Sequence, residues 1–519
     1  MSGHPTPGVL IPELGDVVGN VLNVLAQDFE GFGNNQAVFL RFSDTPDWDT
    51  IQLGDPADGT VFLIDLTEGD PEYGMRHSGG FRADSERGNY ICDNWIAFHN
   101  SDGRPYKPGH TYAAVVTTLV RDKNTGEKAI QDQDFQAMLT TSAPTDSRLH
   151  NTWQAYEPLR EWLVAGGTDP SGIAGAAVFT VGNPAARFQD LQTTIIEQDA
   201  PVLTDTHLCE EGDAGPFADT DDETRGCDGV SDAFYEIQGN VPLPNFQEGE
   251  APFKESQHGG ALNIGGNGLP APVGNAPDVV FSLTLPKNAD MPEDGWPLLL
   301  YAHGTGGNYR SFVANGVADL LSSLTTDDEA ETAFAILSID GVVHGPRAHP
   351  ENWDPDWLAI DPSAYDPGVL FFNVLNPRAA RDNSAQAAAD YFQLARLVDA
   401  EVWDADDSPT GEVVSFDSQN LFYMGHSQGA TTGVAFAAYD STLKSVMLSG
   451  VGGLLIESLA TKEKPYNLKN AIAVGIADPN LDRWNPLLNL VQAVAESADP
   501  VNHAAYVVKE PLEGYDAKD

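Results

Sequence analysis

Between about residues 30 and 190, short apolar runs alternate with turn residues along the chain. The runs are rich in β-branched and aromatic residues, and turns such as Asp55-Pro-Ala-Asp-Gly separate them. Short strands with regular turns between them favour a β-sandwich. The predicted strands are Ala37–Phe42, Thr60–Leu66, Tyr90–Phe98 and Tyr112–Val120.

From about residue 276 onward the pattern changes to an alternation of strands and helices, which predicts a mostly parallel α/β sheet. Continuous apolar runs are typical of strands that are buried on both faces. The clearest helix covers Ser384–Ala400, with its cap predicted at Asp382-Asn383. The predicted strands are Val279–Leu285, Leu298–Ala302, Ala333–Ile339, Leu421–Met424 and Ser445–Leu448.

These patterns predict four segments. Residues 1–28 form an N-terminal tail, and residues 29–190 form the β-sandwich domain. Residues 191–275 form an irregular acidic connector or insertion. Residues 276–519 form the α/β domain, with an apolar cap region at about 451–505 that could cover a site or pack against the sheet. The cap residues are Leu454, Leu455, Leu459, Trp484, Leu487, Leu488, Leu490 and Val491.

The charge of the chain excludes one class of partner and disfavours another. The 519 residues include 27 Lys and Arg against 77 Asp and Glu, a formal net charge of −50. Nucleic-acid binding needs clustered basic residues, and docking on anionic lipid is disfavoured for the same reason. The sequence holds no apolar window of the ~18 residues that a membrane helix needs. The first residues lack the basic region of a secretory signal.

Cysteine and aspartate leave two questions open in the connector. Cys209 and Cys227 could form a disulfide, which would indicate an oxidising compartment, or they could be free thiols like Cys92. The aspartates between them could offer oxygens to Ca²⁺, but the EF-hand spacing is absent, which favours a solvated acidic loop. These aspartates, with two more beyond Cys227, are Asp213, Asp219, Asp221, Asp222, Asp228 and Asp232.

The motif Gly425-His426-Ser427-Gln428-Gly429 is a G-x-S-x-G sequence. A predicted strand leads into the motif and a predicted helix follows it. That context forces the serine into a strained turn, and the two glycines remove side chains that would clash there. The helix N-terminus then stabilises the oxyanion that forms on attack. The sequence therefore predicts Ser427 as a nucleophile, in an elbow formed with Gly425, His426 and Gly429.

A second glycine-rich motif, His303-Gly-Thr-Gly-Gly307, follows another predicted strand. Its place in chain order is that of the loop that supplies the second oxyanion donor in α/β-hydrolases. We expect one donor N–H from Gly304 or Thr305 and the other from Gln428. His303 is expected to hold the loop in shape. His344 and Arg347 follow a strand at the edge where open sheets bind ligands, so a pocket-wall role and no role are equally open.

Together these motifs resemble the extracellular bacterial lipase and esterase branch of the α/β-hydrolases, of the virulence-factor-lipase type. The segment from Tyr106 to Tyr112 similarly resembles the hairpin of bacterial Ig-like domains. The resemblance implies an Ig-like domain before the hydrolase and hydrolysis of carboxylic esters through an acyl-serine, without metal or organic cofactor. The matching residues are Asn245-Phe-Gln-Glu-Gly249, Pro252-Phe253, Gly259-Gly260, HGTGG, Asp340 to Arg347, Asn376-Pro, Arg381-Asp-Asn383, Gln386 and GHSQG.

The triad partners of Ser427 are not evident. In this fold the acid and then the histidine follow the serine along the chain. Only His503 follows Ser427, and Asp478 is the formal acid candidate. We treat both as weak candidates, since Leu468–Ala477 is typical of a cap helix rather than of a strand that carries an acid. The expectation is that the chain stops short of its triad acid and base and is clipped at both ends.

Two functions therefore remain open. The first is a serine esterase or lipase, extracellular or in the cell envelope, acting on small-molecule or lipid esters; amides and polyesters are not excluded. The alternative is a non-catalytic cell-surface or adhesion protein on a degenerate or truncated hydrolase scaffold. Oligomeric state and acyl-chain length are not legible in the sequence.

Overall fold

The computed structural model describes residues 16–29, 31–52, 59–77, 79–219, 222–227, 231–276, 279–325, 331–360, 363–400, 402–463, 467–475, 478 and 481–518. The chain divides into two compact units. Unit 1 comprises Met1–Pro184 and Ile456–Glu496, and unit 2 comprises Ala185–Leu455 and Ser497–Asp519. Within the described residues, no helix has both the length and the apolarity needed to cross a membrane.

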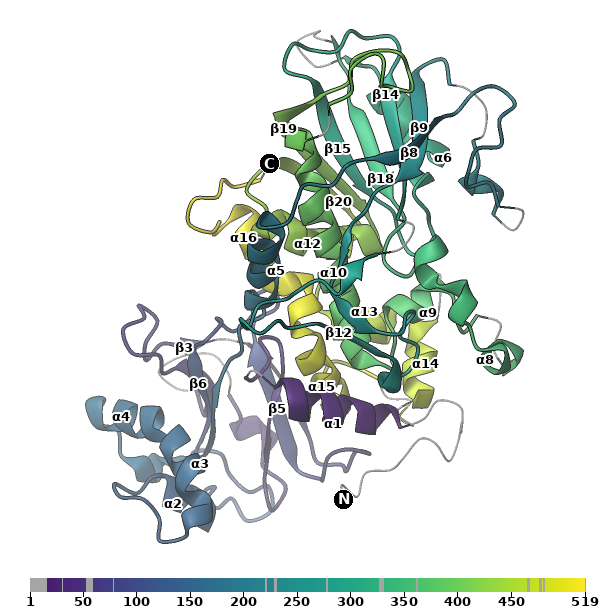
Figure 1. Ribbon diagram of the computed structural model, residues 1–519. Helices are drawn as coiled ribbons and strands as arrows, with labels where there is room; N and C mark the ends of the chain where they lie inside the picture. The colour runs from purple at the N-terminus through teal and green to yellow at the C-terminus, as the bar shows by residue number, and fades with distance from the viewer. Residues whose placement is uncertain are drawn as a thin grey trace. The chain divides into compact units, whose positions relative to one another are not determined.

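Unit 1 is built on two antiparallel sheets (Figure 1). Apolar side chains such as Val38, Phe98, Leu63 and Val116 form one core that joins strands of both sheets. Three of the four strands predicted in this region are confirmed, and the one predicted from Tyr90 begins only at Trp95. That they form an Ig-like domain stays a prediction. One sheet has the order β1-β5-β4, from β1 (Val38–Arg41), β5 (Trp95–Asn100) and β4 (Gly79–Asp84); the other has the order β3-β2-β6-β7, from β3 (Arg76–His77), β2 (Val61–Asp65), β6 (Thr111–Thr117) and β7 (Ile173–Thr180).

Helices complete unit 1 around these sheets. Phe135 of α2 and Leu159 and Leu163 of α4 pack in one cluster with Phe62 and Val115 of the four-stranded sheet. The residues predicted as a cap contribute to this unit, because Val494 of α15 packs against α1. The helices are α1 (Val17–Asp28), α2 (Gln133–Met138), α3 (His150–Ala155), α4 (Glu157–Ala165), α14 (Leu468–Gly475), α15 (Pro486–Ala495) and most of α13 (Leu455–Thr461).

Unit 2 is built on a seven-stranded mixed sheet with the order β20-β19-β15-β18-β14-β9-β8. The pairs β20–β19, β19–β15 and β15–β18 are parallel, whereas β14 is antiparallel to both of its neighbours. This sheet, with its helices, confirms the predicted α/β class. Its strands are β8 (Thr204–Leu208), β9 (Phe234–Asn240), β14 (Val280–Pro286), β15 (Trp296–Ala302), β18 (Ala335–Ile339), β19 (Phe416–His426) and β20 (Leu443–Ser449).

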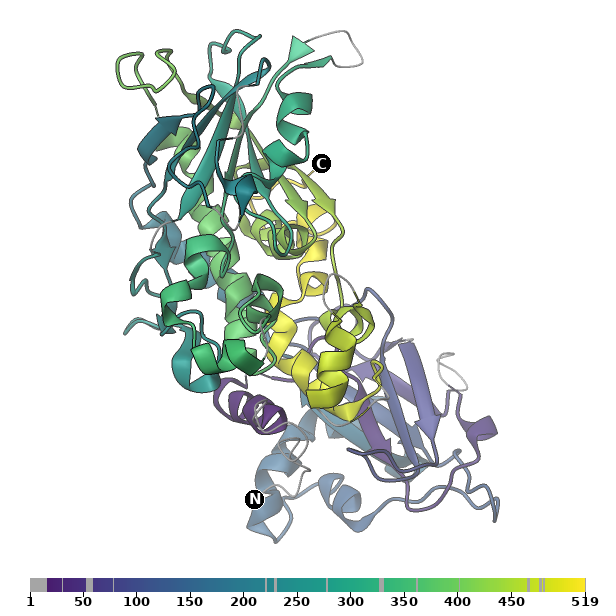
Figure 2. The ribbon, with the colours of Figure 1, turned by 90° about the vertical axis from the view of Figure 1, so that its right-hand side faces the viewer.

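Helices lie beside this sheet in the turned view (Figure 2). Alternating side chains of the sheet enter two different cores. Leu298 and Leu300 of β15 join the large core with α5, α10 and α12, whereas Leu299 and Tyr301 join a smaller core with α6 and α7. The sheet is therefore buried on both faces, which is why its strands are continuous apolar runs. The helices of unit 2 are α5 (Ala186–Ile196), α6 (Ser311–Ala314), α7 (Val317–Leu321), α8 (Pro355–Ile360), α9 (Pro367–Phe371), α10 (Pro377–Ala395), α11 (Leu397–Ala400), α12 (Gln428–Tyr439) and α16 (Ala504–Val508).

Helix α10 begins earlier than predicted, and the cap at Asp382-Asn383 was wrong. Asn376 is the N-cap, because its side chain accepts from the Ala379 N–H, and Pro377 occupies the first turn. Asp382 lies inside the helix, fully buried, and is paired with both Arg187 and Arg381. The ion pair between Arg381 and Asp382 therefore lies in the helix interior.

The stretch 191–275, expected to be an irregular connector, contributes β8 and β9 to the sheet. It also carries short paired strands. Cys209 and Cys227 form a disulfide with a Cα–Cα distance of 5.5 Å, which closes the loop between β8 and β9. The short antiparallel pairs of unit 2 are β10 (Pro244–Asn245) with β13 (Gly274–Asn275), β11 (Gln247–Gly249) with β12 (Gly259–Leu262), and β16 (Leu324–Thr325) with β17 (Glu331–Thr332).

Candidate active site

Ser427 occupies the turn between β19 and α12 with φ 52° and ψ −109°. A non-glycine residue in this region of backbone space is strained by about 1–3 kcal/mol. The flanking glycines are required by close packing: a Cβ at Gly425 would lie 2.7 Å from the Cα of Ala430, and a Cβ at Gly429 would collide with the carbonyl oxygen of Ala302. The local sequence therefore forms the predicted elbow because only glycine fits on either side of the serine.

Main-chain hydrogen bonds hold Ser427 in this strained conformation. Its N–H donates to the carbonyl of Ser449 at the end of β20 (2.8 Å), and its own carbonyl accepts from the N–H and hydroxyl of Thr431 (2.9 and 3.0 Å). The residue is half-buried. Its hydroxyl makes no hydrogen bond to any residue that the structure describes, so it is free to meet a ligand at the N-terminus of α12.

The HGTGG loop after β15 lies directly against the elbow. A Cβ at Gly304 would lie 3.1 Å from the Cβ of Ser427. The hydroxyl of Thr305 donates to the side-chain carbonyl of Gln428 (2.9 Å), and the N–H of Gly429 donates to the carbonyl of His303 (3.2 Å). The structure therefore brings together the residues predicted from the two motifs, including Gly304, Thr305 and Gln428.

Two buried imidazoles brace this loop. His303 donates from Nδ1 to the carbonyl of Gly304 and accepts at Nε2 from the N–H of Gly341, both at 2.9 Å. His344 donates from Nδ1 to the carbonyl of Val342 (2.9 Å) and accepts at Nε2 from the N–H of Gly306 (3.1 Å). Burial lowers the pKa of both histidines, so both are neutral at neutral pH. All four nitrogens are engaged, and neither ring is free to take a proton from Ser427.

A buried ion pair supports the neighbouring strand end, and nothing in the sequence analysis predicted it. Asp340 follows β18 and is fully buried. Its carboxylate pairs with the guanidinium of Arg225 and accepts from the N–H of Tyr309 (3.1 Å). Arg347 donates to the main-chain carbonyl of Asp340 (3.0 Å) and pairs with Asp390 of α10 (2.7 Å). The sequence could have indicated Asp340 as a functional residue, because it directly follows a buried strand. Nothing in the sequence around Arg225 indicates its pairing with Asp340.

His503 lies at the opposite end of α12 from Ser427. Its Nδ1 accepts from the hydroxyl of Tyr439 (2.8 Å), and its Nε2 donates to the carbonyl of Ser497 (2.9 Å). Tyr439 is the last residue of α12, and the helix rises about 1.5 Å per residue, which separates Tyr439 from Ser427 by about 18 Å. Asp478 belongs to unit 1, where its carboxylate accepts from the side chain of Asn485 (3.0 Å). The structure therefore joins neither weak candidate to Ser427.

His503 should make the stability of unit 2 sensitive to acid. Burial lowers the pKa of His503 to about 4, whereas a histidine in an unfolded chain titrates near about 6.5. As pH falls between these values, the unfolded chain takes up a proton that the folded protein excludes, so the free energy of unfolding falls by up to about 1.4 kcal/mol per pH unit. Urea unfolding at pH 7, 6 and 5 should show a shallower loss for His503→Gln than for the unchanged protein. If the free energy of unfolding falls equally with pH in the variant and in the unchanged protein, the result would contradict this role of His503.

The predicted cap residues contact other parts of unit 1. Leu490 and Val491 pack beside Val494 against α1, and Trp484 stacks at 4.9 Å on His99 of β5. In unit 2, the N–H groups of Leu454 and Leu455 donate to the carboxylate of Asp499 (3.0 and 2.7 Å). A covering role for the cap over Ser427 stays a prediction.

Comparison with known proteins adds likenesses in structure only. No protein-family model matches the chain, and no curated protein matches it. An acetyl xylan esterase from Paenibacillus sp. R4 aligns at 14% identity and TM-score 0.31, over 64% of this chain and 86% of that one. Acetyl xylan esterase 1 from Thermoanaerobacterium sp. JW/SL YS485 aligns at 14% identity and TM-score 0.26, over 62% and 82%.

A candidate acetyl xylan esterase from Bacteroides fragilis NCTC 9343 aligns at 11% identity and TM-score 0.25, over 50% of this chain. The alignment spans about half the length of that protein, 51%. The three structural neighbours are thus described as esterases. Because the identities and TM-scores are low, we derive the fold of unit 2 from its own sheet and turns.

Proposed function

We propose that unit 2 is a serine hydrolase of the α/β-hydrolase type that cleaves carboxylic esters through an acyl-Ser427 intermediate. The observation that carries the proposal is the strained φ of Ser427 at the strand-to-helix turn, with the backbone of the HGTGG loop against it. A strained turn of this kind lifts the serine hydroxyl clear of the sheet, at the positive end of α12.

In this mechanism the hydroxyl oxygen of Ser427 attacks the ester carbonyl carbon, and its proton leaves to a general base. The N–H of Gln428 and an N–H from Gly304 or Thr305 donate to the oxyanion. Collapse of the tetrahedral intermediate expels the alcohol, and water then hydrolyses the acyl-serine by the same steps. The proposal assigns no general base, because His303 and His344 have both ring nitrogens engaged and His503 lies at the far end of α12.

The bracing histidines have a clear part in this mechanism. An oxyanion hole works by holding its donors in place before the charge develops. The hydroxyl of Thr305 donates to Gln428, which links the HGTGG loop to the other oxyanion donor. His344 accepts from the N–H of Gly306, which links the HGTGG loop to the loop after β18. The loop therefore needs little rearrangement when the oxyanion forms.

The proposed substrates are acyl esters of glycerol or of similar alcohols. No metal or organic cofactor takes part in the proposed steps. The proposed location is extracellular or in the cell envelope, which the Cys209–Cys227 disulfide supports because such bonds persist in oxidising compartments. Rates on p-nitrophenyl esters of increasing chain length separate a short-chain esterase from a lipase.

Labelling with a fluorophosphonate probe tests the nucleophile. The probe should attach to the unchanged protein and be lost in Ser427→Ala, because it reacts with activated serines. Ser441→Ala is the matched control, since Ser441 is exposed just beyond the C-terminal end of α12 and should label like the unchanged protein. Equal labelling of the Ser427 variant would refute the proposal by placing the reactive residue elsewhere. No labelling of the folded protein would refute it and favour the non-catalytic alternative.

A further inference from the structure

Five side chains with metal-binding chemistry gather at one end of the four-stranded sheet of unit 1. Strands β3, β2 and β6 are neighbours in this sheet. Asp65 ends β2, His77 ends β3 and His110 directly precedes β6. The turn after β2 adds Asp70 and Glu72. Nothing in the proposed ester hydrolysis uses these residues, which belong to a different unit from Ser427.

Candidate ligand atoms converge in two groups that share Asp65. In one group Asp65, Glu72 and His77 offer atoms within 4.8 Å of one another, and in the other Asp65, Asp70 and His110 do so. The first group contains an unusual atom: Nε2 of His77 is buried and has no hydrogen-bond partner among the described residues. It faces Oε2 of Glu72 at 3.9 Å. That separation is too long for a hydrogen bond, and it is about 0.5 Å wider than the ~3.4 Å between two ligands that each lie about 2.1 Å from one tetrahedral ion, so the two side chains would close slightly on an ion.

The carboxylate of Asp65, which both groups share, is held in place by hydrogen bonds, as the carboxylates of metal sites are. Asp65 is fully buried, its Oδ1 accepts from the N–H of Thr67 (2.8 Å), and its Oδ2 accepts from Nδ1 of His110 (2.7 Å). The ring of Tyr112 contacts both imidazoles, with centroids 5.7 Å from His77 and 6.1 Å from His110. These contacts fix the orientation of the groups before any ion arrives, as the outer partners of metal ligands do.

The charge of the cluster is not balanced by the protein. Among the described residues, the ammonium of Lys107 is the one that pairs with its carboxylates, at 3.4 Å from Asp70 Oδ1 and 3.2 Å from Glu72 Oε2. The Lys107 side chain is 42% exposed, so it can swing into solvent when a cation enters. The two carboxylates of the first group, those of Asp65 and Glu72, match the charge of a divalent ion.

We propose that His77 Nε2, Glu72 and Asp65 bind a divalent transition-metal ion of the zinc class. Imidazole nitrogen with carboxylate oxygen is the donor set that such ions prefer, whereas Ca²⁺ and Mg²⁺ take oxygen alone. Three protein ligands leave a position for water. His110 acts by orienting Asp65, and Lys107 is the cation that the metal replaces.

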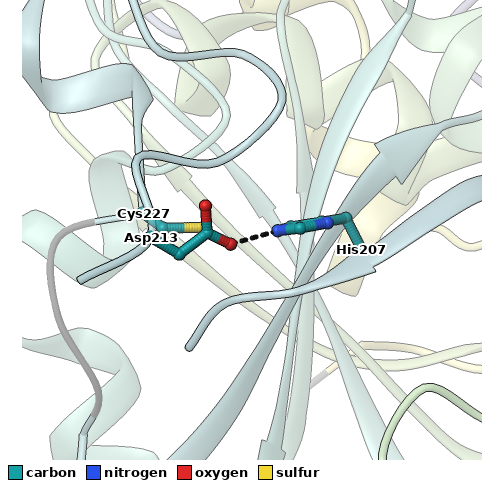
Figure 3. Close-up of side chains that lie close together, drawn as sticks. All are labelled: His207, Asp213 and Cys227. Atoms are coloured by element: carbon teal, nitrogen blue, oxygen red, sulfur yellow. Dashed lines mark hydrogen bonds and ion pairs between the residues drawn. The ribbon is translucent and has the colours of Figure 1, made fainter. Parts of the chain in front are cut away.

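A second cluster of similar composition serves as an internal control. His207, Asp213 and Cys227 in unit 2 also lie close together (Figure 3). The sulfur of Cys227 is bonded to Cys209 and cannot ligate a metal, and the His207 Nε2 is already paired with Asp213. Asp213 accepts from the Gly215 N–H, and Asp222 accepts from Thr224 and Asn308. Of the aspartates that could offer oxygens to Ca²⁺, Asp213 and Asp222 thus have partners, and Asp221 and Asp228 lie outside the described residues.

Titration of the untagged full chain with Co²⁺ followed by visible absorption, and with Zn²⁺ by calorimetry, tests the site. We expect one tight site per chain. His77→Ala should weaken binding by about 100-fold or more, and His110→Ala by about 10-fold. Lys107→Met should strengthen binding, because it removes the competing cation. His207→Ala should bind like the unchanged protein, and circular dichroism should show each variant folded.

Three results would overturn the proposal. The first is no binding of either ion at millimolar concentration, and the second is unchanged binding in folded His77→Ala. The third is loss of binding in His110→Ala with retention in His77→Ala, which would place the ion on the group that contains Asp70. None of these results bears on Ser427, so the outcome is independent of the proposed esterase activity.

Discussion

Replacing Ser427 with alanine should lower the turnover of p-nitrophenyl acetate by about 10⁴-fold or more. Ser427 supplies the atom that becomes acylated. A residual rate should survive, because Gln428 and the HGTGG loop still stabilise an oxyanion when water attacks directly. Steady-state kinetics measures the loss, and mass spectrometry should show the acyl group on the unchanged protein alone. A variant that keeps its turnover would contradict the assignment.

Replacing Ser427 with glycine distinguishes the loss of the nucleophile from the relief of backbone strain. Ser427→Gly should be as inactive as Ser427→Ala, yet more stable than it by about 1 kcal/mol. Glycine accepts φ 52° and ψ −109° without the clash that alanine retains, although glycine has the greater freedom in the unfolded chain. Urea unfolding of the two variants measures the difference. Equal stabilities would mean that the turn stores no strain.

Replacing Asp340 with alanine should lower the free energy of unfolding by about 3–5 kcal/mol. The substitution leaves the Arg225 guanidinium buried without its counter-charge and leaves the N–H of Tyr309 without an acceptor. Urea unfolding of the variant and of the unchanged protein gives the measurement. A loss below about 1 kcal/mol would mean that water replaces the carboxylate.

A double variant controls for the buried charge. Arg225→Met together with Asp340→Ala should be more stable than Asp340→Ala alone, because it removes the unpaired guanidinium as well. The exposed pair of Lys509 and Glu510 provides the surface comparison, and Glu510→Gln should change stability little. If the double variant is less stable than Asp340→Ala, the guanidinium stabilises the fold through other contacts, such as its stacking on Tyr309.

The sequence was most informative where structure is determined locally. The elbow at Ser427 depends on residues within two positions on either side, and a run such as Leu298–Ala302 is apolar because both faces of its strand are buried. The sequence did not predict contacts between segments that lie far apart along the chain. Arg225 and Asp340 are 115 residues apart, and His344 binds an N–H 38 residues away.

Buried polar residues explain the misplaced start of α10. Hydrophobic periodicity treats polar residues as exposed, but Asn383 donates to the carbonyls of Leu370 and Phe371, and Gln386 binds Phe246 and Pro244. This first part of the helix anchors neighbouring loops through hydrogen bonds. Only the resemblance of the Arg381-Asp-Asn383 and Gln386 positions to a known family indicated that these residues matter.

The chain leaves unit 2 after Leu455, contributes Ile456–Glu496 to unit 1, and returns at Ser497. Neither unit is therefore a continuous stretch of the gene. A graft or fusion that transfers residues 185–519 as one uninterrupted piece would carry α15 away from α1 and expose the apolar side of Val494. The two units have to be inherited, exchanged or engineered together, whatever the separate chemistry of each.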